Sequence, residues 1–265
     1  MGESAARHDV VLIHGAWLTS ASWDLFRQRY EARGFHCLAP EWPLQSRPIE
    51  ELRTSPHPAL GRLSISNIVG HYERAIRGLP APPILIGHSF GGLFVQLLLD
   101  RGLGAAGVAI NPAPARGVFP GFTAIRTALP VFLKWLAWRR PATMTLDHFA
   151  RRFMQASSRD EQRAAYEGQI VPAPGRIYFD LALGIGNRVD FSNAKRAPLL
   201  LIAGEQDRTV QLSSVRSAYR KYRRSRAPTE MRTFAGRTHW LIATAGWEEV
   251  ADYAIAWAGE HARKS

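Results

Sequence analysis

The sequence has a single cysteine, Cys37, among its 265 residues. One cysteine excludes an intramolecular disulfide, so composition gives no argument for a secreted, disulfide-stabilised fold. The segment around it, Phe35–Ala39, is mostly apolar, and we expect Cys37 to be a small core residue in a strand. Long apolar runs are missing near the N-terminus, where Val10–Ile13 is too short for a signal peptide or a membrane span. These absences predict a cytoplasmic protein without a transmembrane segment.

Lysine is also scarce: it provides only four of the 34 basic residues, and the formal net charge is +12. The densest basic stretch, residues 220–226, ends a predicted surface helix, and no nucleic-acid-binding module accompanies it. We therefore expect no nucleic-acid partner. The sequence has no metal-ligand cluster and no dinucleotide-binding glycine motif, so no metal and no cofactor are predicted. A small-molecule substrate and a monomer or homodimer are the expectation.

Apolar runs alternate with helical patterns along most of the chain, which predicts an α/β fold with a mainly parallel sheet covered by helices. The expected strands are Val10–Ile13, His36–Leu38, Ile84–Ile86, Val108–Ile110, Leu199–Ala203 and Glu230–Phe234.

The interval between the strands that end at Ile110 and begin at Leu199 is far longer than an ordinary connection. It carries helical patterns at Thr123–Arg139, Leu146–Gln155 and Arg159–Glu167, which predict an inserted helical cap. We accordingly divide the chain into a first core segment at 1–112, a cap at 113–192 and a second core segment at 193–265.

One segment, Gly87–Gly91, has the pattern Gly-x-Ser-x-Gly. The apolar run Ile84–Ile86 precedes it, and a helix-compatible run, Leu93–Leu99, follows it. A strand, a sharp turn and a helix in this order form a nucleophile elbow, which exposes a serine hydroxyl at the end of a sheet. Glycines are needed there because side chains would clash across the turn. We therefore predict that Ser89 is a catalytic nucleophile.

A serine hydroxyl needs a general base to become a good nucleophile. His239 lies just after the last predicted strand, within Gly236–Trp240, and it is the only one of nine histidines in that position. We predict His239 as the base.

The base in turn needs an orienting acid. Asp207 follows the penultimate strand in Gly204–Asp207, with Glu205 as the second candidate. Asn111 stands at the alternative position after the preceding strand, but an amide cannot stabilise an imidazolium as a carboxylate does. We therefore predict Asp207 as the acid.

Acyl transfer also needs backbone N–H groups that stabilise an oxyanion. One should belong to Phe90, directly after the nucleophile, and the other to Ala16, in the loop after the first strand. His14 and His88 are interpreted as supports of these loops rather than as catalytic groups.

These segments together resemble the α/β-hydrolase superfamily with an inserted helical cap. The resemblance rests on His14–Trp17, Gly87–Gly92, Gly204–Asp207 and Gly236–Trp240, and it spans the chain except for the cap. It implies an α/β-hydrolase fold and a Ser-His-Asp triad, whose order along the chain is that of the superfamily. The first two strands of many members are missing, which implies a six-stranded sheet.

The resemblance leaves several chemistries open. Dehalogenases and epoxide hydrolases of this fold use an aspartate nucleophile, and similar hydroxynitrile lyases carry a lysine where this chain has Trp240. We expect a serine hydrolase that cleaves carboxylic esters or lactones through an acyl-enzyme. A carbon–carbon bond hydrolase or a cofactor-free perhydrolase would use the same triad, and a ligand receptor with a vestigial triad is a further alternative.

Aromatic residues are abundant in the cap, and they predict a mainly apolar pocket between cap and core. The expected pocket residues are Trp17, Phe119, Phe122, Trp135, Trp138 and Trp240. The cap is also basic, and we interpret its cations as solvent-exposed, with an anionic substrate or surface as the alternative. These cations are Lys134, Arg139, Arg140, Arg151 and Arg152.

Overall fold

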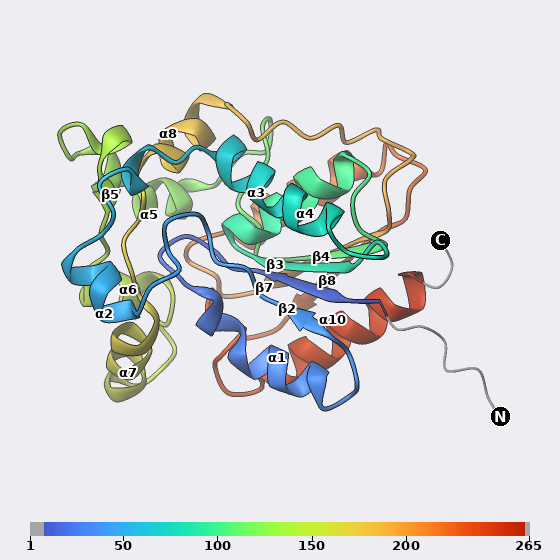
Figure 1. The fold of residues 1–265 in the computed structure, drawn as a ribbon, viewed down its shortest axis with the longest axis horizontal. Coiled ribbons are helices and arrows are strands. Elements are labelled where there is room, and N and C mark those ends of the chain that lie inside the picture. Colours follow the sequence, from blue (N-terminus) through green and yellow to red (C-terminus); the bar gives the residue numbers. More distant parts are fainter. Residues whose placement is uncertain (1–7, 263–265) are drawn as a thin grey trace.

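Six parallel strands form the central sheet of the computed structural model, which describes residues 8–262 (Figure 1). The order across the sheet is β2-β1-β3-β4-β7-β8, and every neighbouring pair is parallel. The strands are β1 (Val10–Ile13), β2 (Cys37–Leu38), β3 (Ile84–His88), β4 (Ala106–Ile110), β7 (Leu199–Gly204) and β8 (Thr229–Phe234). All six strands predicted from the sequence are therefore present, and the sheet has the expected six strands. The outer ends of the predicted core segments, residues 1–7 and 263–265, lie outside the described residues.

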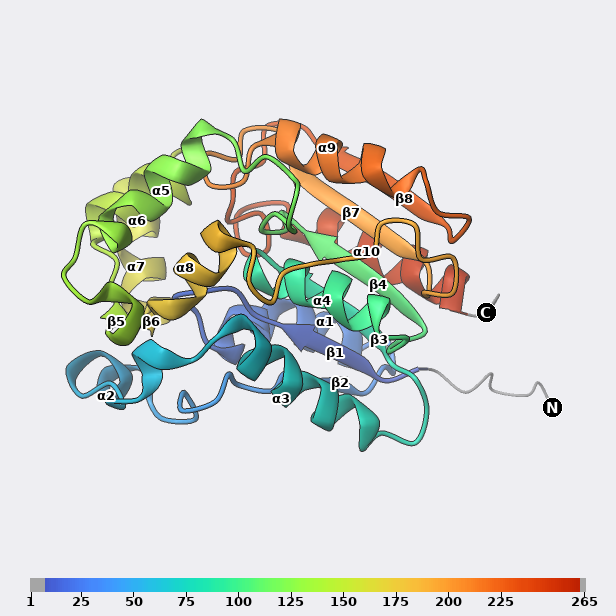
Figure 2. The same cartoon turned by 90° about the horizontal axis from the view of Figure 1, so that it is seen from above.

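Helices cover both faces of the sheet, which explains why its central strands are continuous apolar runs (Figures 1 and 2). In β1, Val11 and Ile13 belong to one buried cluster, and Val10 and Leu12 belong to the other, on the opposite face. The first cluster includes residues of α3 (Ile65–Arg77), α4 (Phe90–Asp100) and α9 (Leu212–Tyr222). The second includes residues of α1 (Asp24–Glu31) and α10 (Trp247–Ala262).

The interval between β4 and β7, where the sequence predicts a cap, is mainly helical and lies at one end of the sheet; we keep the term cap for it (Figure 2). Two short antiparallel strands, β5 and β6, pair within it. Its elements are α5 (Phe122–Phe132), the 3₁₀ helix Ala137–Arg139, β5 (Pro141–Ala142), α6 (Leu146–Arg152), α7 (Arg159–Gln169), β6 (Ala173–Pro174) and α8 (Arg176–Leu183).

The single helix expected over residues 123–139 is divided in the structure. Helix α5 ends at Phe132, and Leu136 adopts the left-handed conformation with φ 55° before the 3₁₀ helix begins. Pro130 lies inside the last turn of α5, where proline removes an N–H donor and crowds the preceding turn. The sequence pattern predicted that Trp135 and Trp138 continue the helix of α5, but in the structure they lie beyond its end.

One element of the first core segment also lies against the cap. The Arg53 side chain in α2 (Ile49–Thr54) donates hydrogen bonds to the carbonyl oxygens of Tyr166 and Ile170, each at 2.6 Å. This contact between segments distant in sequence was not predicted. None of the described helices is long and apolar enough to cross a membrane.

Candidate active site

Ser89 occupies the turn between β3 and α4 with φ 57° and ψ −118°. A side chain at positive φ is strained, and such strain persists only where the surrounding structure enforces it. The strand before the serine is fully buried, and Phe90 begins the helix directly after it. The strand, strained serine and helix are arranged as in the elbow predicted from the sequence.

Close backbone approaches explain the two glycines of the motif. A Cβ atom on Gly87 would collide with the Gly91 carbonyl, and one on Gly91 would collide with the carbonyl of Ile13 in β1. A Cβ atom on Gly15 would lie 2.9 Å from the Cβ atom of Ser89, so the loop after β1 lies directly beside the serine. The glycines therefore allow two loops and a helix to converge on Ser89.

His239 and Asp207 form a hydrogen-bonded pair at the same edge of the sheet. The distance from His239 Nδ1 to Asp207 Oδ2 is 2.7 Å, and both side chains are fully buried. His239 Nε2 is buried and has no hydrogen-bond partner among the described residues. The imidazole is thus oriented through one nitrogen, while the other nitrogen remains available to accept a proton.

Backbone donors hold the Asp207 carboxylate in place. Its Oδ1 accepts from the N–H groups of Thr209 at 2.6 Å and Val210 at 2.8 Å, which leaves Oδ2 for His239. Glu205, the second candidate for the acid, is exposed and accepts instead from the Gly236 N–H. The geometry therefore favours Asp207 over Glu205.

Two buried side chains position the His239 loop. His88 Nε2 hydrogen-bonds to the His239 carbonyl oxygen at 2.9 Å, and Asn111 Nδ2 donates to the same oxygen at 3.4 Å. Asn111 Oδ1 also accepts from the Gly204 N–H at 2.7 Å, so this amide links the ends of β4 and β7 to the histidine loop. The alternative position for the acid, directly after β4, therefore holds an amide that links three segments.

The loop after β1 is stabilised by His14. Its Nδ1 donates to the Gly15 carbonyl at 3.0 Å, and its Nε2 accepts from the Trp42 N–H at 3.2 Å. The Ala16 N–H in this loop has no hydrogen-bond acceptor among residues 8–262. The Phe90 N–H is the first of α4, where helix N–H groups have no partner within the helix. The two N–H groups are thus without an acceptor in the described chain, and their role as oxyanion donors stays a prediction.

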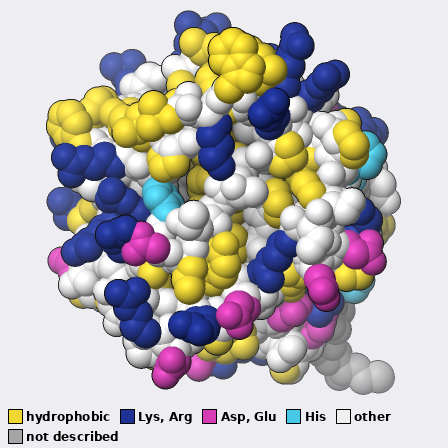
Figure 3. Space-filling model, turned by 90° about the vertical axis from the view of Figure 1, so that its left-hand side faces the viewer, with side chains coloured by type: hydrophobic (Ala, Val, Ile, Leu, Met, Phe, Trp, Pro, Cys, Tyr) yellow, Lys and Arg dark blue, Asp and Glu magenta, His cyan; other side chains and the backbone are white. Residues whose placement is uncertain are grey.

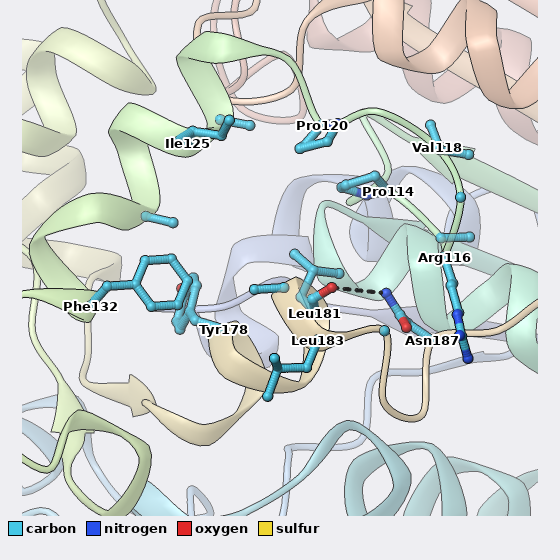
Figure 4. Close-up of a pocket in the computed structure, with 16 residues that line it drawn as sticks. Pro114, Arg116, Val118, Pro120, Ile125, Phe132, Tyr178, Leu181, Leu183 and Asn187 are labelled. Atoms are coloured by element: carbon cyan, nitrogen blue, oxygen red, sulfur yellow. Dashed lines mark hydrogen bonds between the residues drawn. The ribbon is translucent and has the colours of Figure 1, made fainter.

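A cavity of about 460 Å³ lies between the loop 114–120 and helices α5 and α8, and all of its lining residues belong to the predicted cap segment (Figure 4). Its walls are mainly apolar, with Arg116 and Asn187 at one side. Ser89 does not line it, but two contacts join its wall to the elbow. The Tyr178 ring lies 5.4 Å from that of Phe90, and the Ala113 N–H, next to the wall, donates to the Ser89 carbonyl at 2.9 Å.

Two polar atoms in the cavity wall are buried without a hydrogen-bond partner in the described part of the chain: Tyr178 Oη and Asn187 Oδ1. Burial raises the pKa of Tyr178 well above its ordinary value, so its hydroxyl stays neutral and can donate a hydrogen bond. The Asn187 amide nitrogen is already used, since it donates to the Leu181 carbonyl at 3.3 Å (Figure 4). Both atoms are nonetheless buried, so neither contacts the open space of the cavity.

Sequence comparison places these observations in a family. The sequence profile of the alpha/beta hydrolase family matches residues 10–253. The chain belongs to the alpha/beta hydrolase family. A search of curated proteins found no match.

Solved structures share the fold of this alpha/beta hydrolase at low sequence identity. A monoacylglycerol lipase of Paleococcus ferrophilus is 22% identical with a TM-score of 0.71, covering 95% of this chain and 94% of that one. A pyrethroid hydrolase of Sphingobium faniae JZ-2 is 16% identical with a TM-score of 0.66, covering 96% and 98%. An Arabidopsis methylesterase is 14% identical with a TM-score of 0.68, covering 94% and 98%. At these identities the likeness shows the fold alone.

The predicted pocket residues of the hydrolase separate into two groups. Trp17 and Trp240 are buried but do not line the cavity: Trp17 packs on Tyr178, and Trp240, which follows His239 in the chain, packs on Phe153. The other four do not line the cavity described above, which corrects the expectation for that cavity. All four are exposed on the cap: Phe119 precedes α5, Phe122 begins it, and Trp135 and Trp138 follow its early end.

Two residues near the site were not predicted as parts of it. Tyr178 in α8 lines the cavity, and Phe153, which follows α6, packs edge-on against the His239 ring at 4.7 Å. The apolar segment Ile177–Leu183 was a visible signal for α8, but nothing in its pattern indicates which residue faces the elbow. The described residues contain no group of three or more His, Cys, Asp or Glu that could hold a metal ion.

The buried His88 makes the folding stability of the hydrolase depend on pH. Burial, followed by the nearby His239, holds the pKa of His88 well below its ordinary value. Below pH about 6.5 the unfolded chain gains a proton that the folded chain excludes, so stability is complete above that pH and decreases on acidification. We expect this group to contribute a slope of about 1.4 kcal/mol per pH unit below that value, measured by urea denaturation.

Replacing His88 with glutamine should reduce this slope, because the titrating group is removed. The matched control is His57→Gln, since His57 is exposed and lies outside the site. Equal slopes for His88→Gln and the unchanged protein would contradict the assignment.

Proposed function

We propose that this alpha/beta hydrolase cleaves carboxylic esters, lactones included, of mainly apolar small molecules through an acyl-enzyme. The main supporting observation is the buried Asp207–His239 pair at 2.7 Å, with His239 Nε2 unpartnered and the His239 ring 4.6 Å from that of His88, which precedes the strained Ser89. This arrangement has the parts that an activated serine requires. The names of similar structures, a monoacylglycerol lipase, a pyrethroid hydrolase and a methylesterase, support ester cleavage.

The proposed reaction has two halves. Ser89 Oγ attacks the ester carbonyl while His239 Nε2 takes its proton, and the Ala16 and Phe90 N–H groups stabilise the oxyanion. His239 then returns the proton to the leaving alcohol, which leaves the acyl group on Ser89. In the second half, water loses a proton to His239 and attacks the acyl-enzyme. The acid leaves, and Ser89 recovers its proton.

The cavity supports the choice of substrate. Its apolar wall suits an acyl or alcohol group of medium size. Trp240 follows the catalytic histidine and packs on Phe149 at 5.1 Å. No lysine stands there, which disfavours cyanohydrin cleavage.

A series of p-nitrophenyl esters tests the proposal. Hexanoate should show a kcat/KM about tenfold or more above that of acetate, because each buried CH₂ contributes about 0.8 kcal/mol and about 1.4 kcal/mol corresponds to tenfold. Release of p-nitrophenol measures the rate. Saturable binding of these esters without turnover would instead indicate a ligand receptor, and cleavage of a diketone in preference to every ester would indicate a carbon–carbon bond hydrolase.

A further inference from the structure

The cap exposes large apolar side chains, most of which belong neither to the buried core nor to the cavity wall. Phe122, Ile125, Leu129 and Leu133 are spaced by three, four and four residues, so they share one face of α5 and its end. Leu133 is 76% exposed and Phe122 is 73% exposed. With Phe119 and Trp135, these residues form what we call the apolar cap face. A soluble surface rarely leaves a contiguous group of this kind without a partner.

The same stretch of chain is charged with one sign. Residues 113–146 contain five cations and no aspartate or glutamate. The cations are Arg116, Arg126, Lys134, Arg139 and Arg140. None of them forms an ion pair with a carboxylate of the described residues. Figure 3 shows this side of the molecule, with hydrophobic side chains gathered at its upper edge among lysine and arginine side chains.

Neighbouring helices add to this positive field. The pKa of Arg152 in α6 lies below its ordinary value because of partial burial and because Arg126, Arg208 and Arg151 repel its charge. Of these, Arg151 has a carboxylate partner, Asp147, whereas Arg126 and Arg208 have none among the described residues. The apolar cap face is therefore bordered by positive charge that the protein itself does not neutralise.

We propose that the apolar cap face docks on a lipid surface that carries anionic headgroups. Aromatic and aliphatic side chains on one helix face enter the boundary between headgroups and acyl chains, while flanking arginine and lysine side chains contact the phosphates. Leu133 and Trp135 provide the first element, and Lys134 and Arg126 provide the second. A second copy of this chain is a poorer occupant, since a two-fold contact places the same cations opposite one another.

Docking would also orient the cavity toward the lipid. Ile125 belongs to the apolar cap face and also lines the cavity. The exposed Leu183 of α8 lines the cavity as well. If the proposed ester hydrolysis holds, an apolar ester dissolved in the lipid layer reaches the cavity without crossing water. This consequence rests on the proposed function, whereas docking itself does not.

Vesicle co-sedimentation tests the docking surface. The unchanged protein should bind phosphatidylcholine vesicles containing phosphatidylglycerol at least about tenfold better than pure phosphatidylcholine, with binding weakened by added salt. The Leu129→Gln/Leu133→Gln variant should lose about tenfold or more of this binding. Leu25→Gln is the matched control, because Leu25 is an exposed leucine on α1, outside the cap.

Further variants separate the contributions of charge and apolar contact. Arg126→Gln/Arg139→Gln should remove the preference for anionic vesicles, whereas Arg220→Gln/Arg223→Gln, at the end of α9, should keep it. Trp135→Gln provides an independent single change if the double leucine variant does not fold. Hydrolysis of a soluble acetate ester should be unchanged in Leu129→Gln/Leu133→Gln.

The outcomes distinguish the two proposals. Absence of vesicle binding by the unchanged protein, or equal binding by Leu129→Gln/Leu133→Gln, overturns docking. A dimer that dissociates in this variant, seen by analytical ultracentrifugation, would assign the face to a second copy and also overturn it. Vesicle binding without any ester hydrolysis would leave docking intact and reject the proposed function.

Discussion

Ester hydrolysis should fall by about 10⁵-fold or more when Ser89 is replaced by alanine, because no acyl-enzyme can then form. Residual turnover would come from the oxyanion donors and from binding alone. A serine-directed phosphonate should add a single adduct to the unchanged protein, located on the peptide that contains Ser89. Initial rates with p-nitrophenyl hexanoate and mass spectrometry of the labelled peptide measure the two effects.

A matched control for this change is Ser214→Ala, since Ser214 is also buried but lies on α9. The fold should survive in both variants, because alanine keeps a Cβ atom at the same strained φ and Ser89 Oγ is not needed to cap α4. Thermal denaturation checks this. A phosphonate adduct elsewhere, or undiminished hydrolysis by Ser89→Ala, would reject the nucleophile.

The core and the positions of Ser89, Asp207 and His239 at one edge of the sheet could be predicted from sequence, because both depend on local signals. Strands buried on both faces are continuous apolar runs, and each is bounded by a turn. Gly87 and Gly91 are required by close backbone approaches, so the elbow is recognisable before any contact is known. Asp207 and His239 follow β7 and β8, and parallel strands bring such loops to one edge of the sheet.

The cap could not be predicted to the same depth, because its geometry depends on contacts between distant segments. The apolar pattern around Trp135 fits a long helix, yet the chain turns at Leu136 and exposes that tryptophan. Tyr178 reaches Phe90 only through the packing of α8 on the core. The contact between Arg53 and the end of α7 joins residues more than a hundred positions apart. No periodicity in the sequence encodes such pairings.

Asp207→Asn should lower kcat by about 10⁴-fold while the fold survives. The reason lies in the hydrogen bonds of the carboxylate. Oδ1 accepts from the Thr209 and Val210 N–H groups, so an asparagine would keep its carbonyl oxygen there and turn its NH₂ group toward His239 Nδ1. Nδ1 must then accept, which moves the imidazole proton to Nε2. An imidazole protonated at Nε2 cannot take the proton of Ser89.

Glu205→Gln is the matched control, because it removes one carboxylate from the same loop. Glu205 is exposed and accepts from the Gly236 N–H, and a glutamine oxygen can accept the same hydrogen bond. We therefore expect its kcat to stay within about twofold, since loss of an exposed carboxylate away from the imidazole has little effect on the reaction. Steady-state kinetics with p-nitrophenyl hexanoate, and denaturation to confirm folding, compare the two variants. If Glu205→Gln were the damaging change and Asp207→Asn nearly silent, the acid of the triad would be Glu205, and the buried pair at His239 would be structural.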